Sequence, residues 1–193
     1  MPSGVLLLGI QKTKNAMLND IFTQIKDQWV RAKHQKKHPF RYVTLTTVAS
    51  DCTPESRTVV LRDFDASQLT FTIYTDARSR KVKALQKHPV VQLLFYDHKH
   101  LWQITVTARL KRMGAAPTIY KQLPPPSRKD YTTTAAPGTP IDHPDHVHYK
   151  DENHFYALFF EAEKVESLRL KRPHHLRAVF QRNDDWKGQF LTP

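Results

Sequence analysis

Cysteine and long apolar runs are scarce in this sequence. Cys52 is the only cysteine among 193 residues, so no disulfide can form within the chain, and a reducing compartment is expected. No apolar run approaches the roughly 20 residues that a membrane-spanning helix requires. Segment 1–12 has only a short apolar run with no basic residue before it, which does not fit a secretory signal. We therefore expect a cytoplasmic protein without a membrane segment.

Acidic residues are also few. The chain has 18 Asp and Glu against 30 Lys and Arg, which gives a formal net charge of +12. Such a balance favours anionic partners. Part of the charge is concentrated in 31–37 and 169–177, but no helix-turn-helix, zinc-finger or RNA-recognition motif accompanies it. Nucleic-acid binding is kept only as an alternative, because charge without a reading motif supports weak, salt-sensitive binding.

The remaining pattern is mainly that of strands. The length suits one domain, 1–193, with an ample core. Apolar residues recur at helical spacing in 15–37, which predicts an amphipathic helix. Closely spaced turn signals then separate runs of β-branched and aromatic residues, as in a small antiparallel barrel of the mainly β (α+β) class. Strands are expected at 41–49, 58–61, 69–75, 90–96, 102–111, 155–161, 164–170, 176–181 and 186–191, with short helices at 79–87 and 116–123.

Two of these segments carry more specific expectations. Segment 90–96 is almost continuously apolar, which predicts that both of its faces are covered. Segment 124–153 is rich in Pro, Thr, Asp and His and has no period, so we expect a long loop inside the domain that covers a site or is mobile. It contains His143, His146 and His148, and His154 follows it. Their irregular spacing, with no cysteine nearby, favours a solvated His-rich loop, and no metal site is predicted.

The segment 57–81 carries the strongest functional signal. Two strand-like runs are separated by an Asp/Ser turn, and Ser79 then fits the N-cap of a helix. Arg80 and Lys81 lie at the start of that helix, where the helix dipole is positive and acidic residues would be favoured. Free backbone amides at the same end form an anion site. The sequence therefore predicts that an anion binds here.

The order of the motifs R-x-V-V-L-R, Y-T and S-R-K resembles the FMN-binding split-barrel family typified by pyridoxamine 5′-phosphate oxidase. The closing segment R-A-V-F-Q-R-N-D-D-W resembles the end of the same family. The resemblance implies an FMN cofactor and a homodimer with FMN at the interface. By the matched motifs, the phosphate site would comprise Arg57, Ser79, Arg80 and Lys81, with Tyr74 and Thr75 before it. The backbone of Val59, Val60, Leu61 and Arg62 would lie along the flavin. Gln103 and Arg177 would reach the flavin from the partner chain.

The positions that hold the substrate phosphate in these oxidases match less well. Arg62 replaces a Lys, which keeps the charge but alters its hydrogen-bond geometry. Pro124 and Pro173 stand where the family has Arg, and Ser167 stands near the position of a Trp that flanks the flavin. His175 keeps the family His and is the candidate substrate contact.

We therefore expect an FMN-dependent oxidoreductase of this family, with an unidentified small-molecule substrate or electron donor. The alternatives are a true pyridoxamine or pyridoxine 5′-phosphate oxidase and a flavin-binding protein without turnover. Haem or a deazaflavin could replace FMN on this fold, and nucleic-acid binding is the remaining alternative.

Overall fold

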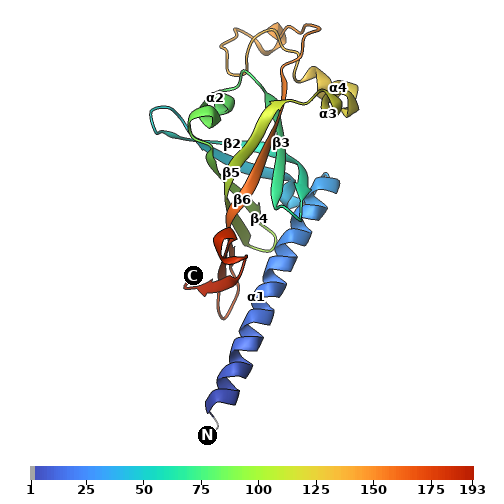
Figure 1. The fold of residues 1–193 in the computed structure, drawn as a ribbon. Coiled ribbons are helices and arrows are strands. Elements are labelled where there is room, and N and C mark those ends of the chain that lie inside the picture. The colour runs from blue at the N-terminus through green and yellow to red at the C-terminus, as the bar shows by residue number, and fades with distance from the viewer. Residues whose placement is uncertain (1–2) are drawn as a thin grey trace.

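A closed antiparallel barrel forms the centre of the protein (Figure 1). The computed structural model describes residues 3–193, with side chains from residue 11 onward. The strand order is β3-β2-β1-β4-β5-β6, and pairing of β3 with β6 closes the barrel, while β7 and β8 extend the sheet beyond β6. The strands are β1 Tyr42–Val48, β2 Pro54–Asp65, β3 Thr70–Asp76, β4 Val90–Asp97, β5 Trp102–Ala115, β6 Phe155–Arg169, β7 Leu176–Gln181 and β8 Gly188–Leu191. The helices are α1 Ser3–His34, α2 Arg80–Lys87, α3 Pro117–Gln122 and α4 Pro125–Lys129.

The C-terminal half of α1 packs against the barrel core. Trp29 is fully buried among three phenylalanine rings, with ring centroids 5.1 Å from Phe64, 4.8 Å from Phe71 and 5.6 Å from Phe95. These rings come from β2, β3 and β4, so one helical side chain holds three strands together. The N-terminal half of α1 projects away from the barrel (Figure 1). The barrel with flanking helices that the sequence predicts is confirmed.

Several predicted boundaries are wrong. Strand β2 spans Pro54–Asp65, whereas the sequence predicts only 58–61; β5 extends to Ala115 rather than 111; and α4 lies inside the segment predicted as a loop. Helix α1 begins at Ser3 and ends at His34, whereas the sequence predicts 15–37. Strand β6 is continuous, whereas the sequence predicts two strands, 155–161 and 164–170. The charged residues in its middle are compatible with a strand because β5 supplies cross-strand partners. Lys111 Nζ lies 3.0 Å from Glu161 Oε2, and Arg109 Nε donates to Glu163 Oε1 at 2.6 Å.

The expectation that both faces of 90–96 are covered is also wrong within one chain. Val91, Leu93 and Phe95 are buried, whereas Val90 and Tyr96 are 37% and 47% exposed. The strand therefore alternates in burial although it does not alternate in sequence. Its outer side is an apolar surface on the barrel wall.

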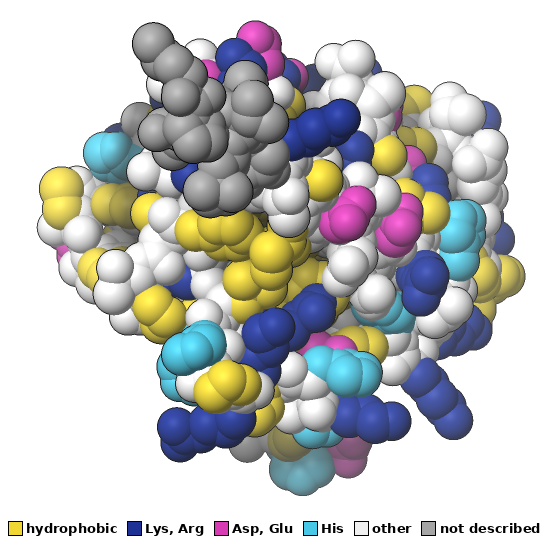
Figure 2. Space-filling model, turned by 90° about the horizontal axis from the view of Figure 1, so that it is seen from below, with side chains coloured by type: hydrophobic (Ala, Val, Ile, Leu, Met, Phe, Trp, Pro, Cys, Tyr) yellow, Lys and Arg dark blue, Asp and Glu magenta, His cyan; other side chains and the backbone are white. Residues whose placement is uncertain are grey.

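Charge and hydropathy are distributed unevenly over the surface. On the face shown in Figure 2, Lys and Arg side chains are scattered around an apolar area and do not form one continuous basic patch. Among the residues that the structure describes, no helix is long and apolar enough to cross a membrane.

Replacing Trp29 with alanine should lower the free energy of unfolding by about 3–5 kcal/mol, because a large cavity would open between α1 and three strands. Met17→Ala on the exposed side of the same helix should change it by no more than about 0.5 kcal/mol. Urea unfolding followed by circular dichroism measures both. Equal effects of the two substitutions would contradict the packing role assigned to Trp29.

Candidate functional site

Four side chains that the sequence singles out converge where β3 leads into α2. Lys81 Nζ donates to Thr75 Oγ1 at 2.9 Å, and Thr75 Oγ1 lies 3.2 Å from Ser79 Oγ. Both hydroxyl residues are buried. The pKa of Lys81 is lowered, first by burial and then by the positive charge of Arg57, with Asp76 opposing the change. We call Arg57, Thr75, Ser79 and Lys81 the basic cradle.

The start of α2 adds backbone donors to this cradle. Ser79 is the N-cap residue, as the sequence predicts, but its hydroxyl makes no capping hydrogen bond to the helix. It lies instead beside the Thr75 hydroxyl. The first turn of α2 has no acidic side chain. The amides of that turn and its positive dipole therefore favour an anion at this end of the helix.

Glu55 orders the arginines at the cradle, and sequence reasoning missed it. Arg57 Nη2 donates to Glu55 Oε2 at 2.9 Å, and Arg80 pairs with the other oxygen of the same carboxylate. Arg57 Nη1 also donates to the Thr47 hydroxyl at 2.7 Å. Strand alternation was an available signal, because Glu55 precedes Arg57 by two residues and so lies on the same face of β2.

The two arginines differ in their surroundings. Burial lowers the pKa of Arg57, while Glu55 opposes that change and Arg80 adds to it. The Arg80 side chain is 79% exposed, so it lies at the rim, whereas Arg57 is held deeper by two partners. Arg57 and Lys81 are therefore the inner cations of the site.

Arg62 and Tyr74 lie together in a different environment. The Arg62 guanidinium is 5.4 Å from the centre of the Tyr74 ring, and Tyr74 packs on Phe155. Burial raises the pKa of Tyr131, and Arg62 opposes this through its charge and a hydrogen bond. Within the described part of the chain, Arg62 is thus grouped with tyrosines and makes no hydrogen bond or ion pair with the cradle. The segment between the two arginines, Val59, Val60 and Leu61, continues β2 up to a register shift between Leu61 and Asp63.

Gln103 and Arg177 share one row of the sheet. Gln103 pairs with Leu168 on β6, and Leu168 pairs with Arg177 on β7, so the three side chains project from the same face. Arg177 donates to Glu166 Oε1 from Nε at 3.0 Å and from Nη2 at 2.6 Å. No hydrogen bond or ion pair among the described residues joins this row to the cradle.

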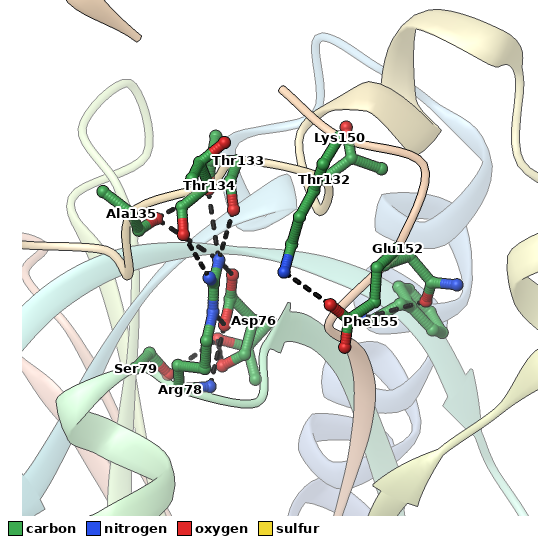
Figure 3. A network of polar contacts seen from close by, with 12 residues as sticks. Asp76, Arg78, Ser79, Thr132, Thr133, Thr134, Ala135, Lys150, Glu152 and Phe155 are labelled. Atoms are coloured by element: carbon green, nitrogen blue, oxygen red, sulfur yellow. Dashed lines mark hydrogen bonds and ion pairs between the residues drawn. The ribbon is translucent and has the colours of Figure 1, made fainter. Parts of the chain in front are cut away.

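Arg78 fastens the long loop beside the cradle (Figure 3). Its guanidinium pairs with the buried Asp76 carboxylate, with Nη2 2.7 Å from Oδ2. The same guanidinium donates to the carbonyls of Thr133 at 2.9 Å, Thr134 at 3.0 Å and Ala135 at 3.3 Å. Apart from the position of Arg78 next to Ser79, no local pattern pointed to this role. The loop is therefore anchored at the start of α2.

None of the described histidines belongs to a cluster that could hold a metal ion. His143 Nδ1 accepts a hydrogen bond from the Asp145 amide, and the His143 and His146 rings lie 5.8 Å apart. Across the residues the structure describes, no group of three or more His, Cys, Asp or Glu side chains could hold a metal ion. His175 accepts a hydrogen bond from the Lys171 amide at 3.2 Å and is exposed.

The strand order and the closure of the barrel match the split-barrel fold. A family model described as "Pyridoxamine 5'-phosphate oxidase, FMN-binding domain" matches residues 21–113, which include the whole cradle. A pyridoxine/pyridoxamine 5'-phosphate oxidase from Herminiimonas arsenicoxydans is 29% identical over 175 residues, covering 90% of this chain and 74% of that protein. One from Myxococcus xanthus (strain DK1622) is 37% identical over 74 residues, or 38% of this chain and 35% of that protein. The match thus spans about a third of the Myxococcus relative.

Solved structures support the same fold. A pyridoxamine 5'-phosphate oxidase-related, FMN binding protein from Nostoc punctiforme PCC 73102 is similar with a TM-score of 0.69 and 22% identity, covering 84% of this chain and 94% of that one. PhzG from Burkholderia lata 383 has a TM-score of 0.72 and 17% identity, covering 89% and 92%. The chain is thus similar in sequence and in fold to the pyridoxamine 5'-phosphate oxidase-like FMN-binding proteins, as the sequence motifs predict. FMN is the cofactor of the matched domain, and the family is generally dimeric.

The residues present fit the phosphate of FMN. Arg57 and Lys81 lie beside the Thr75 and Ser79 hydroxyls and the first amides of α2, with Glu55 as the partner of Arg57, and burial penalises the charge on each cation. A bound phosphate would offset both penalties, because charge-assisted hydrogen bonds to phosphate are stronger than neutral ones.

Arg78→Ala should loosen the long loop without unfolding the barrel. Hydrogen exchange should accelerate at the amides of Thr134, Lys150 and His154, which bond within or next to the loop. Arg109→Ala, which removes an exposed ion pair with Glu163, is the matched control and should leave these amides unchanged. Unchanged exchange in Arg78→Ala would show that the guanidinium does not hold the loop.

Proposed function

We propose that this protein is an FMN-dependent oxidoreductase that acts on a small molecule in the cytoplasm and works as a homodimer. The observation that carries the proposal is the basic cradle, in which Arg57 and Lys81 share a half-buried site at the first turn of α2. A dianionic phosphate would supply the negative charge that balances these two cations and the positive end of the helix dipole.

Each cradle residue has a defined part in holding the phosphate. The Lys81 ammonium and the Arg57 guanidinium contribute charge, and the Ser79 and Thr75 hydroxyls contribute directional donors. Glu55 acts through Arg57 by fixing its orientation. Arg80, at the rim, adds a screened positive charge.

When bound, FMN supplies the hydride or electron transfer. The contribution of this chain would be to position it: the β2 backbone from Val59 to Arg62 would hold the ring, and Gln103 and Arg177 of a second copy would supply polar groups to it. A cation beside the ring favours its reduced, anionic form. Glu166 holds the Arg177 side chain in place through two hydrogen bonds to one oxygen.

The outer side of β4 supports dimerisation. Tyr96, which is 47% exposed, pairs directly with Gln103 across the β4–β5 ladder. The exposed apolar surface is therefore continuous with the row that carries Gln103 and Arg177. Burying Tyr96 against a second copy would bring that row to the other chain's cofactor.

The substrate side separates this protein from the biosynthetic oxidases. Arg62 is engaged with Tyr74 and Tyr131, while Pro124 and Pro173 replace arginines of the oxidase pattern. These departures favour a small-molecule substrate or donor other than pyridoxamine 5′-phosphate. His175 is exposed on the turn before β7 and is the candidate substrate contact.

Lys81→Met should weaken FMN binding by roughly tenfold to a hundredfold, because one charge-assisted contact of about 1.5–3 kcal/mol is lost. FMN fluorescence titration measures the affinity, and Lys83→Met, an exposed lysine on the same helix, is the control that should bind as the wild type does. Equal affinities of the two variants would contradict the assignment of Lys81.

The same substitution should not destabilise the FMN-free protein. The pKa of Lys81 is lowered in the folded state, so between that value and 10.5 the folded chain binds fewer protons than the unfolded chain. The free energy of unfolding of the wild type should therefore increase as the pH rises through this window, and that of Lys81→Met should not show this increase. Urea unfolding at neutral and alkaline pH tests this. A larger alkaline gain in the variant would reverse the assigned sign.

Hybrid dimers test whether the site is shared between chains. One chain carries Arg57→Ala with Lys81→Met, and the other carries Gln103→Ala with Arg177→Ala, each with its own affinity tag. A hybrid should contain one intact and one doubly damaged site, so half of its sites should bind FMN with wild-type affinity, whereas both parent dimers should bind weakly. Weak binding at every site of the hybrid would show that the two residue groups do not act across the dimer.

A further inference from the structure

A second cavity, of about 290 Å³, lies at the other end of the barrel. It is bounded by α1, by the turn between β4 and β5, and by the end of β6. It shares no residue with the basic cradle. Its size is at the lower end of the range for small-molecule sites.

Arg169 lines this cavity and has an unused hydrogen-bonding capacity. Its guanidinium lies 4.0 Å from the centre of the Trp102 ring, and its Nε is buried without a hydrogen-bond partner. Among the described residues it makes no ion pair. Burial lowers the pKa of Arg169 and the charge of Asp97 opposes this, but the Asp97 carboxylate is itself bonded to the His100 ring at 2.6 Å and to two backbone amides. Arg169 is thus a cation with free N–H groups at a cavity wall.

Trp102 fixes the plane of that guanidinium. The indole is buried, and its Nε1 donates to Ser167 Oγ at 2.8 Å. A stacked guanidinium on a fixed ring retains its edge for ligands. Ser167, which stands near the position of the family Trp, serves here to orient a different tryptophan.

Gln28 supplies a second donor through a chain of hydrogen bonds. His38 Nδ1 accepts from the Phe40 amide at 3.1 Å, so the ring proton of the neutral histidine is on Nε2. Burial lowers the pKa of His38, which favours the neutral form. Nε2 then donates to Gln28 Oε1 at 3.0 Å, which leaves the Gln28 amide N–H groups available at the cavity. The amide of Gln24 on the next helical turn makes no hydrogen bond with the described residues.

We propose that this cavity binds a small monocarboxylate through the Arg169 guanidinium and the Gln28 amide. The fork of one guanidinium matches the two oxygens of a carboxylate. The negative charge of Asp97, which lines the cavity, repels a dianion such as phosphate more strongly than a monoanion, and Lys171, another lining residue, offsets part of that repulsion. Leu170, which also lines the cavity, provides apolar contact for the body of the ligand. The assignment is independent of the flavin site.

Titration of the purified 193-residue chain with sodium butyrate tests the proposal. The probe is the indole N–H resonance of Trp102 in a nitrogen-proton NMR spectrum, with Trp29 and Trp186 as internal references. Butyramide, the neutral counterpart, and inorganic phosphate are titrated in parallel. Arg169→Gln removes the charge, Arg169→Lys keeps the charge but not the fork, and Lys87→Gln on the exposed side of α2 is the control.

The expected result is a saturable shift of the Trp102 resonance with butyrate at millimolar concentration and none with butyramide. Affinity should fall about tenfold in Arg169→Gln and also fall in Arg169→Lys, while Lys87→Gln matches the wild type. Tighter binding of phosphate would overturn the assignment to carboxylates. Absence of a saturable shift, or a shift that both Arg169 variants retain, would overturn the site itself.

Discussion

Pairing of β3 with β6 is the constraint on which the rest of the site depends. Its last pair joins Asp76 to Phe155, so the end of β3 and the beginning of β6 are fixed together. Asp76 holds Arg78, which fastens the long loop, and the next residues along the chain are Ser79 and the start of α2. Closure of the barrel therefore determines the geometry of the cradle and of the loop in one step.

The cradle is an electrostatic compromise built on this frame. Arg57 and Lys81 are partly removed from water, which lowers the pKa of both groups; the charge of Arg80 lowers the pKa of Arg57 further, and the charge of Arg57 that of Lys81. Glu55 relieves the repulsion on Arg57, whereas Lys81 has only a hydroxyl partner. The partly buried cations lower the free energy of unfolding of the FMN-free protein and favour the binding of a phosphate-sized anion. Functional sites commonly lower stability in this way.

Local pattern was sufficient for much of the fold and part of the site. The strand at 102–111 and the helix cap at Ser79 are encoded within a few neighbouring residues, and the order of the short motifs indicated the family resemblance and FMN. The continuity of β6 was not visible, because the charges in its middle are neutralised by residues of β5 that lie about fifty positions earlier. The same limit hid Arg78, whose loop partners are more than fifty residues away. The alternate burial of β4 residues was also not predicted. It depends on which face of the strand packs against the barrel core, and a nearly continuous apolar sequence does not specify that face.

The most direct test of the account is the visible absorption spectrum of the purified protein after loading with FMN and removal of excess. The account predicts a flavin spectrum that corresponds to one FMN per chain and that is lost when Arg57 and Lys81 are both replaced. A colourless wild-type protein that cannot be loaded with FMN would contradict it.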